Sequence, residues 1–266
     1  MRKSKWQKIM PVLLIALALF FFYLPIILTM FFSFNSSRSL SSWSGFSLQW
    51  YQSLFNDRAI ISAVTTTVSI AVISTIIATV VGTIAAIGIS HTKPLIKELI
   101  LSVNNLPILN PDIVTAIGLM LLFTTLQIPK GFTTMLLAHI AFCIPFVILS
   151  VLPKLRRLDP NIAEAAMDLG ATPWQALVKV IVPQILPGII SGALIAFTMS
   201  FDDFVISYFV TGNGVKNISI LVYTMSKRIN PTINALSTIM IIMVTVVLIV
   251  INIIPLFKKK ERTVLE

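Results

Sequence analysis

Long apolar segments alternate with shorter polar segments along almost the whole sequence. Each apolar segment is long enough to cross about 30 Å of hydrocarbon as an α-helix. The proline and glycine residues inside these segments do not contradict this interpretation, because membrane helices tolerate both. The pattern therefore predicts six transmembrane helices, at roughly 9–32, 60–90, 99–126, 132–152, 184–208 and 232–257.

The composition predicts an all-α membrane protein. Hydrophobic residues make up 56% of the 266 residues and charged residues only 11%, and the mean hydropathy is +0.94. A soluble domain could not hide that much apolar surface in one core. A basic N-terminus before an apolar run is also typical of a signal peptide, but this run continues to Phe32. It is too long for a signal sequence, and we interpret it as an uncleaved first span.

The basic residues indicate orientation. The formal net charge is +10, but the basic residues flank apolar runs instead of forming one basic face, which argues against nucleic acid as a partner. With the N-terminus inside, only six of the 20 Lys and Arg residues lie on outer segments: Arg38, Arg58, Lys130, Lys216, Lys227 and Arg228. This asymmetry predicts that both termini are cytoplasmic.

Cys143 is the only cysteine, so no intrachain disulfide is expected.

Two polar segments are long. The outer one, 33–58, is amphipathic from Leu48 onward, with Leu48, Tyr51 and Phe55 at helical spacing. This pattern favours a helix at the membrane interface, and a docking surface is the alternative.

The inner polar segment, 153–183, predicts two short helices joined by a turn, and we call it the elbow. Asp159 is expected to cap the first helix, with Pro160 at its first position and Gly170 at its end. Thr172 is expected to cap the second helix, with Gln175 completing a capping box.

The first elbow helix has the features of a docking element. It carries the run Glu164-Ala165-Ala166-Met167-Asp168-Leu169-Gly170-Ala171. Its small residues share one side and its two carboxylates another, which suits docking into a groove on another protein. Catalysis or metal binding by the carboxylates is not favoured, because no histidine lies near them in sequence. The chain also lacks a G-x-x-x-x-G-K-[ST] phosphate loop, so we expect no ATPase site and no metal or other cofactor of its own.

Small residues recur at every fourth position in two predicted spans. They are Ser74, Ala78, Gly82 and Ala86 in the second span, and Gly188, Gly192, Ala196 and Ser200 in the fifth. Such ridges allow helices to approach closely in lipid. Lining a narrow pathway is the alternative, and the two roles are compatible.

Three acidic residues lie in or near apolar spans, where a charge is expensive. Asp112 follows Asn110-Pro111, which predicts a helix start inside the third span, roughly 22 Å past Lys97 on a straight helix. A carboxylate there is either stabilised by the helix dipole or part of a transport site, and the sequence leaves both open.

Asp202 and Asp203 are predicted near the outer end of the fifth span. On a helical wheel Asp203 falls on the small-residue ridge and Asp202 to one side, which favours Asp203 as a ligand. Acids that cap an outer loop are the alternative. Several carboxylates with nearby aromatic residues (Phe201, Phe204 and Tyr208) suit an elongated polycation.

His139, in the fourth span, is more simply a buried neutral hydrogen-bonded histidine than a proton relay.

The elbow, from Glu164-Ala165-Ala166 through Gly170 to Pro183, resembles the cytoplasmic coupling motif of ABC importer permeases of the type I fold. Ser33-Phe34-Asn35-Ser36-Ser37, Pro111-Asp112-Ile113-Val114, His139 through Phe146, and Ser200-Phe201-Asp202-Asp203 through Gly212 resemble one of the two permeases of spermidine/putrescine importers. The resemblance covers nearly the whole chain.

The resemblance implies a permease subunit in the bacterial inner membrane. Its expected parts are 1–58 (first span and outer loop), the permease core 59–257 and a basic cytoplasmic tail 258–266. It implies a heterodimer with a second permease, two copies of an ATP-binding subunit that bind ATP and magnesium, and an extracytoplasmic polyamine-binding protein. Coupling would fall to Glu164, Ala165, Ala166, Asp168, Leu169 and Gly170, and the substrate pathway to Asp112, Asp202, Asp203 and Tyr208. Related permeases carry iron, thiamine or phosphonates, and an autonomous cation channel or proton-coupled carrier is the rival class.

Overall fold

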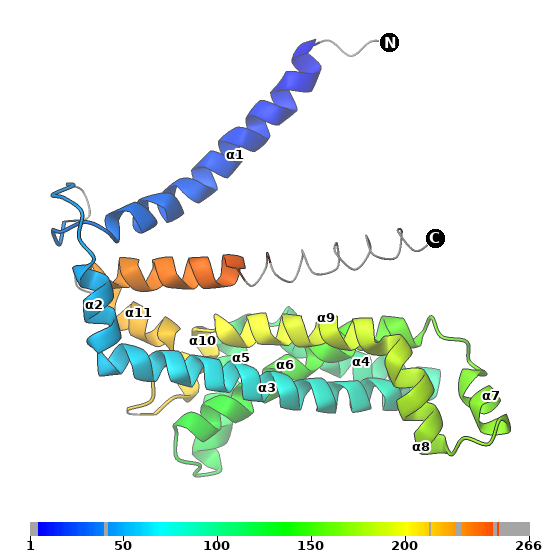
Figure 1. Ribbon diagram of the computed structural model, residues 1–266. Helices are drawn as coiled ribbons and strands as arrows, with labels where there is room; N and C mark the ends of the chain where they lie inside the picture. The colour runs from blue at the N-terminus through cyan, green and yellow to red at the C-terminus, as the bar shows by residue number, and fades with distance from the viewer. Residues whose placement is uncertain (1–4, 40–41, 213, 227–229, 247–248, 250–266) are drawn as a thin grey trace. The chain divides into compact units, whose positions relative to one another are not determined.

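The computed structural model describes residues 5–39, 42–212, 214–226, 230–246 and 249 of the 266-residue chain. The chain divides into two compact units, Met1–Ile61 with Val222–Glu266, and Ser62–Leu221. The helices are α1 (Lys5–Phe32), α2 (Gln49–Asn56), α3 (Arg58–Ser90), α4 (Pro94–Leu109), α5 (Asp112–Thr125), α6 (Phe132–Leu155), α7 (Ile162–Asp168), α8 (Pro173–Ala176), α9 (Val182–Phe201), α10 (Val205–Val210) and α11 (Ile218–Ser226). No β-strand occurs in the described ranges, which confirms the all-α prediction (Figure 1).

The described apolar helices account for four or five membrane crossings. Four helical stretches are long and apolar enough to cross a membrane: Met10–Phe32, Arg58–Ser90, Phe132–Leu155 and Pro173–Phe201. The pair α4 and α5 makes a fifth candidate if it counts as one bent span. The predicted sixth span begins with the apolar helix Thr232–Val246, and its remainder to residue 257 lies largely outside the described residues, as does the tail 258–266.

The predicted third span is not straight. Helices α4 and α5 meet at a bend of 104°. Asn110 is extended (φ −80°, ψ 144°), as expected for a residue that precedes proline, and Pro111 has no N–H to continue the helical ladder. The distance estimated for Asp112 along a straight helix is therefore wrong, although the predicted helix start at this position is confirmed.

The predicted fifth span is shifted toward the elbow. Helix α8 continues through a π-helical turn, Leu177–Ile181, into α9, and α9 ends at Phe201 instead of reaching Tyr208. The π-type bond from the Val182 N–H to the Leu177 carbonyl lies directly before Pro183. Because proline clashes with the carbonyl four residues earlier, a wider turn relieves this contact. The second elbow helix is thus the first part of a long bent helix.

Helix α6 is the centre of the Ser62–Leu221 unit, where it packs against α4, α9 and α10. Gly82 of α3 and Gly192 of α9 both face Val147 of α6. A Cβ at Gly82 would lie 2.8 Å from the Val147 Cβ, and one at Gly192 would lie 3.1 Å from the Val147 Cα. Both small-residue ridges therefore serve close packing against α6, as one of the two interpretations predicted.

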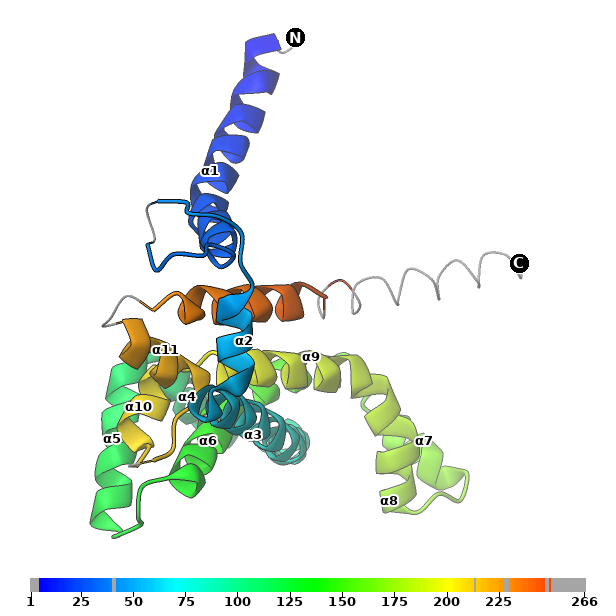
Figure 2. The ribbon, with the colours of Figure 1, turned by 60° about the vertical axis from the view of Figure 1, so that its left-hand side comes forward.

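Within this unit the elbow and the acidic residues lie far apart. Figures 1 and 2 both show α7 and α8 at one end of the long helices, and α5 and α10 at the other end. Because α3, α6 and α9 run between these ends, they connect the protruding elbow with the distant acidic residues.

The other unit contains a compact loop between α1 and α2. Asn35 is fully buried, and its side chain bonds the carbonyls of Ser39 and Ser42 and the N–H of Ser44. The Trp50 indole donates to the Asn35 carbonyl at 2.6 Å. The predicted helix after Leu48 is confirmed as α2, and these contacts fix it to the loop.

We expect Gly82→Ala to destabilise the helix packing, because its new methyl group overlaps Val147. The expected cost is about 1–3 kcal/mol, measured as a lower midpoint of thermal unfolding of the purified protein in detergent. Gly88→Ala on the same helix is the control, since no atom lies within 4 Å of its Cβ position. Equal midpoints for the two variants would contradict the close approach of α3 and α6.

Candidate functional site

The three predicted acidic residues line one cavity. This cavity has a volume of about 370 Å³, and its lining residues are Asp112, Phe142, Met199, Asp202, Asp203, Phe204 and Val205. Asp112 opens α5, and the other two acids follow α9, about 90 positions later in the chain. They meet because α10 packs along α5. Tyr208 is absent from the lining and is 46% exposed, with its ring 5.4 Å from that of Phe204.

Asp202 and Asp203 occupy a break between two helices. Helix α9 ends at Phe201, and α10 begins at Val205. The wheel that placed Asp203 on the ridge assumed a continuous helix through both acids, and this assumption is wrong. Asp203 instead caps α10, since its Oδ1 accepts from the Ile206 N–H at 3.2 Å and its Oδ2 from the Ser207 N–H at 2.7 Å.

His139 of α6 lies against this break. Its Nε2 is 3.0 Å from the Ser207 Oγ and 3.4 Å from the Asp203 Oδ2, and its Nδ1 is 2.7 Å from the Ser200 Oγ. The imidazole is 2% exposed, which confirms the buried, hydrogen-bonded histidine that the sequence favoured. Ser200 continues the chain of contacts to Ser74 of α3, with 3.0 Å between the two hydroxyls.

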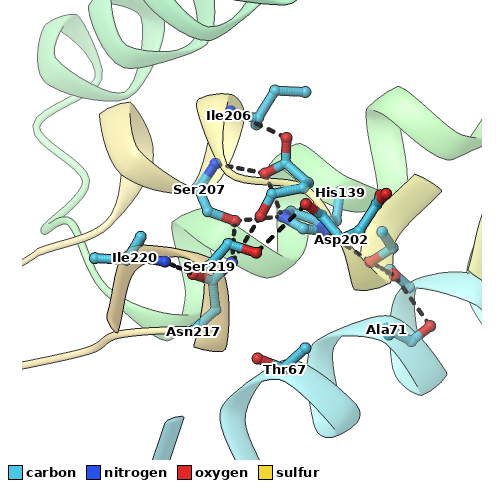
Figure 3. A network of polar contacts seen from close by, with 12 residues as sticks. Thr67, Ala71, His139, Asp202, Ile206, Ser207, Asn217, Ser219 and Ile220 are labelled. Carbon is cyan, nitrogen blue, oxygen red and sulfur yellow. Dashed lines mark hydrogen bonds and ion pairs between the residues drawn. The ribbon is translucent and has the colours of Figure 1, made fainter. Parts of the chain in front are cut away.

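Asn217 closes the network from the other side (Figure 3). Its amide nitrogen donates to the Asp203 carbonyl and to the Ser207 Oγ, each at 2.9 Å, and its amide oxygen accepts from the Ile220 N–H. Each polar atom of this buried side chain therefore has a partner. The contacts satisfy backbone groups that the interrupted helix leaves open, which is required where water is scarce.

The two neighbouring acids have different surroundings. The Asp203 side chain is 8% exposed and accepts backbone N–H groups on both oxygens. Asp202 is exposed, and no other described residue forms a hydrogen bond or ion pair with its carboxylate, which contacts only its own backbone N–H. Its carbonyl accepts from the Ser219 hydroxyl at 3.3 Å. Asp112 is also exposed. The cavity therefore offers two open carboxylates and one that is engaged.

Metal binding is not indicated at this site. No group of three or more His, Cys, Asp or Glu side chains within the described ranges has the spacing to hold a metal ion. The cavity combines carboxylates with the rings of Phe142 and Phe204. Carboxylates and aromatic faces are the groups that attract organic ammonium ions.

The elbow differs from its predicted outline at one end. Helix α7 begins at Ile162, not at Pro160, and Asp159 accepts the Asn161 N–H in a turn before the helix. At the other end the prediction is confirmed: Gly170 has φ +89°, and the Gly170 and Ala171 N–H groups bond the Met167 and Ala166 carbonyls. This is a Schellman motif.

The second elbow cap is confirmed in full. Thr172 Oγ1 accepts from the Gln175 N–H, and the Gln175 side chain accepts from the Thr172 N–H, so the two residues form the predicted capping box. Leu169 is 90% exposed and Trp174 is 71% exposed. Glu164, Ala165 and Asp168 are also exposed, and Ala166 is half-buried. The elbow thus presents a rigid turn with two large apolar side chains in the open.

Sequence reasoning missed Ser207 and Asn217. Ser207 carried a signal, because it is a polar residue between Ile206 and Tyr208, whereas Asn217 follows Lys216 in a polar segment and did not stand out. Their role depends on the break after Phe201, which the apolar pattern did not reveal. Ser200 was noted as a small residue in a ridge and as part of the resemblance, but not as a hydrogen-bonding partner of His139.

The comparisons with known proteins agree with this arrangement. Residues 78–257 match the family model described as "Binding-protein-dependent transport system inner membrane component". The spermidine/putrescine transport system permease protein PotC of Haemophilus influenzae is 37% identical over 224 residues, covering 84% of this chain and 87% of the relative. The putrescine transport system permease protein PotI of Escherichia coli is 36% identical, covering 90% of this chain and 86% of the relative.

A solved structure has a similar fold at low identity. A bacterial ABC transporter involved in the import of the polysaccharide alginate contains a chain with a TM-score of 0.69 and 17% identity, covering 93% of this chain and 94% of that one. This chain belongs to the family of binding-protein-dependent transport system inner membrane components. It is a multi-pass inner-membrane protein with the ABC importer permease fold.

We expect Asn217→Asp to destabilise the protein strongly. The substitution keeps the shape but removes two donors and adds a charge beside Asp203 and Ser207. The expected cost is about 2–3 kcal/mol or more, measured by thermal unfolding. Ser219→Ala, which loses one long bond to Asp202, is the control and should change stability by less than about 0.5–1 kcal/mol. Unchanged thermal stability of Asn217→Asp would contradict a structural role for the Asn217 hydrogen bonds.

Proposed function

We propose that this chain is a permease subunit of an ATP-driven polyamine importer, with spermidine or putrescine as cargo. The observation that carries the proposal is the cavity where Asp112, Asp202 and Asp203 meet beside Phe142 and Phe204. Carboxylates at several points suit a flexible chain with several ammonium groups. The names of relatives at 36–37% identity over most of the chain support the same cargo.

In this proposal the cavity faces the extracytoplasmic side and the elbow the cytoplasm, with both termini cytoplasmic. The Lys and Arg distribution supports this orientation. A polyamine-binding protein delivers the cargo, and a second permease completes the pathway. The lipid bilayer surrounds the apolar faces of both subunits.

The elbow couples the pathway to a dimer of ATP-binding subunits, which bind ATP and magnesium. Its exposed turn, with Leu169 and Trp174, offers the apolar surface for docking. Glu164 and Asp168 lie on the exposed helix beside it. The chain itself would then hold no cofactor and hydrolyse no ATP.

The acidic cavity also argues against one of the alternative cargoes. A phosphonate is an anion, and two open carboxylates would repel it. Iron and thiamine remain competing cations for the cargo test. An autonomous carrier would leave the protruding elbow without a role.

We expect the reconstituted complex to hydrolyse ATP faster when its binding protein is loaded with a polyamine. Spermidine and putrescine should stimulate the rate severalfold, whereas thiamine, ferric iron and a phosphonate should not. The purified chain alone should show no ATPase activity. Stimulation by one of the other solutes instead, or transport without ATP-binding subunits, would refute the proposal.

We expect Gly170→Arg to abolish coupling without affecting membrane insertion. The backbone at Gly170 has φ +89° and no neighbour within 4 Å of its Cβ position. The variant therefore adds backbone strain of about 1–2 kcal/mol and a bulky charge at the docking turn. Transport and cargo-stimulated ATPase should be lost while the amount of inserted protein is unchanged.

Gly170→Asn is the matched control for this experiment, because asparagine tolerates positive φ. It should retain much of the activity. Loss of insertion in Gly170→Arg would mean that the glycine serves folding and not coupling.

A further inference from the structure

We propose that His139 is a positioning residue that fixes the break between α9 and α10, so that Asp202 and not Asp203 binds the ammonium group of the cargo. The proposal rests on the proposed function, because it assumes that a polycation enters this cavity. It reverses the assignment that the helical wheel favoured, in which Asp203 was the ligand and Asp202 lay to one side.

The hydrogen bonds of Asp203 leave little capacity for cargo. Both carboxylate oxygens accept backbone N–H groups from the first turn of α10, and Oδ2 also faces the His139 Nε2. An ammonium group would have to compete with these contacts at a side chain that is only 8% exposed. Asp203 therefore holds α10 in place.

Asp202 has the opposite character. It lies one residue earlier, lines the same cavity and is exposed. Among the described residues, no other residue forms a hydrogen bond or ion pair with its carboxylate, which contacts only its own backbone N–H. Together with Asp112, it can approach an ammonium group without first losing a protein partner.

His139 connects the two sides of the break. Its Nδ1 contacts Ser200, in the last turn of α9, and its Nε2 contacts Ser207 of α10. The imidazole comes from α6, the helix at the centre of this unit. It therefore holds the end of α9 and the start of α10 against the same helix. Figure 3 shows the ring of His139 beside Ser207, with Asn217 on the other side of Ser207.

The direction of Asp202 depends on this connection. Asp202 is the C-cap residue that follows α9 (φ −100°, ψ 2°), and the hydrogen bond from its N–H to the Thr198 carbonyl is long, at 3.4 Å. Helical hydrogen bonds therefore constrain it weakly. If the α10 side of the break loses its contact with His139, Asp202 is free to turn out of the cavity.

Two substitutions distinguish the roles of the two ring nitrogens of His139. His139→Gln places an amide near the Nε2 position and can keep the contact with Ser207 and Asp203, whereas His139→Asn reaches only the Nδ1 side and Ser200. In the reconstituted complex we expect His139→Asn to raise KM for spermidine roughly tenfold with a smaller change in kcat. His139→Gln should stay within about threefold of the parent protein.

A double-mutant cycle tests whether His139 acts through Asp202. Asp202→Asn should raise KM by itself, and adding His139→Asn to it should raise KM little further, because the carboxylate to be positioned is already gone. KM effects that multiply would overturn the proposal. Equal losses of kcat and thermal stability in His139→Asn and His139→Gln, with KM unchanged, would also overturn it by showing a purely structural role.

A test without cargo keeps the geometry separate from the proposed function. Asp202→Cys is treated with a charged thiol reagent in membranes that contain the assembled complex; Cys143 is fully buried and serves as a silent background. Labelling should be fast in the parent and His139→Gln backgrounds and several times slower with His139→Asn. Identical labelling in all backgrounds would refute the positioning role. The expected labelling pattern together with no polyamine transport by the parent complex, which keeps Asp202, would refute only the proposed function.

His91→Asn is the control histidine variant. His91 is exposed at the end of α3, and its Nδ1 bonds its own helix at the Ile87 carbonyl. It should leave both KM and the labelling rate unchanged. A shift as large as that of His139→Asn would mean that the effect is not specific to the break.

Discussion

The arrangement of the candidate site depends on one constraint: the backbone groups of a broken helix need partners in surroundings that contain little water. The chain interrupts its fifth span after Phe201 and meets this requirement with side chains from other segments. Asp203 caps α10, while Asn217 satisfies the Asp203 carbonyl. These contacts hold the break in one arrangement, so that the Asp202 carboxylate has a defined direction. In a continuous helix the side chain could only point outward from the helix surface.

Two interruptions together produce the cavity. The bend at Asn110 and Pro111 exposes the start of α5 with Asp112 in its first turn, and the break after Phe201 exposes Asp202. Helix α10 packs along α5 and brings the two interruptions together. Half-helices that meet in this way are a common means of forming transport sites in membrane proteins, since they bring polar groups into the membrane without leaving the backbone unsatisfied.

The elbow and the cavity lie at opposite ends of the same unit. Between them, α6 holds α3 and α9 at close range through contacts of Val147 with Gly82 and Gly192. In such close packing, a displacement at one end is transmitted along stiff helices instead of being absorbed by loosely packed side chains. The second half of the elbow is continuous with α9, which gives a direct mechanical connection from the second elbow helix to the residue before Asp202.

The sequence by itself determined the apolar helices, the Gly170 turn, the capping box at Thr172, the helix start at Asp112 and the buried state of His139, because each follows from local chemistry or from hydrophobic pattern. It did not determine the end of α9, since the apolar pattern resumes at residue 204 directly after the two acids, and a continuous helix could also satisfy it. The tertiary structure decided that Asp112 shares a cavity with Asp202, that Tyr208 lies outside it, and that Ser207 and Asn217 support the break. These outcomes depend on contacts between residues far apart in the chain, and local periodicity carries no information about such contacts.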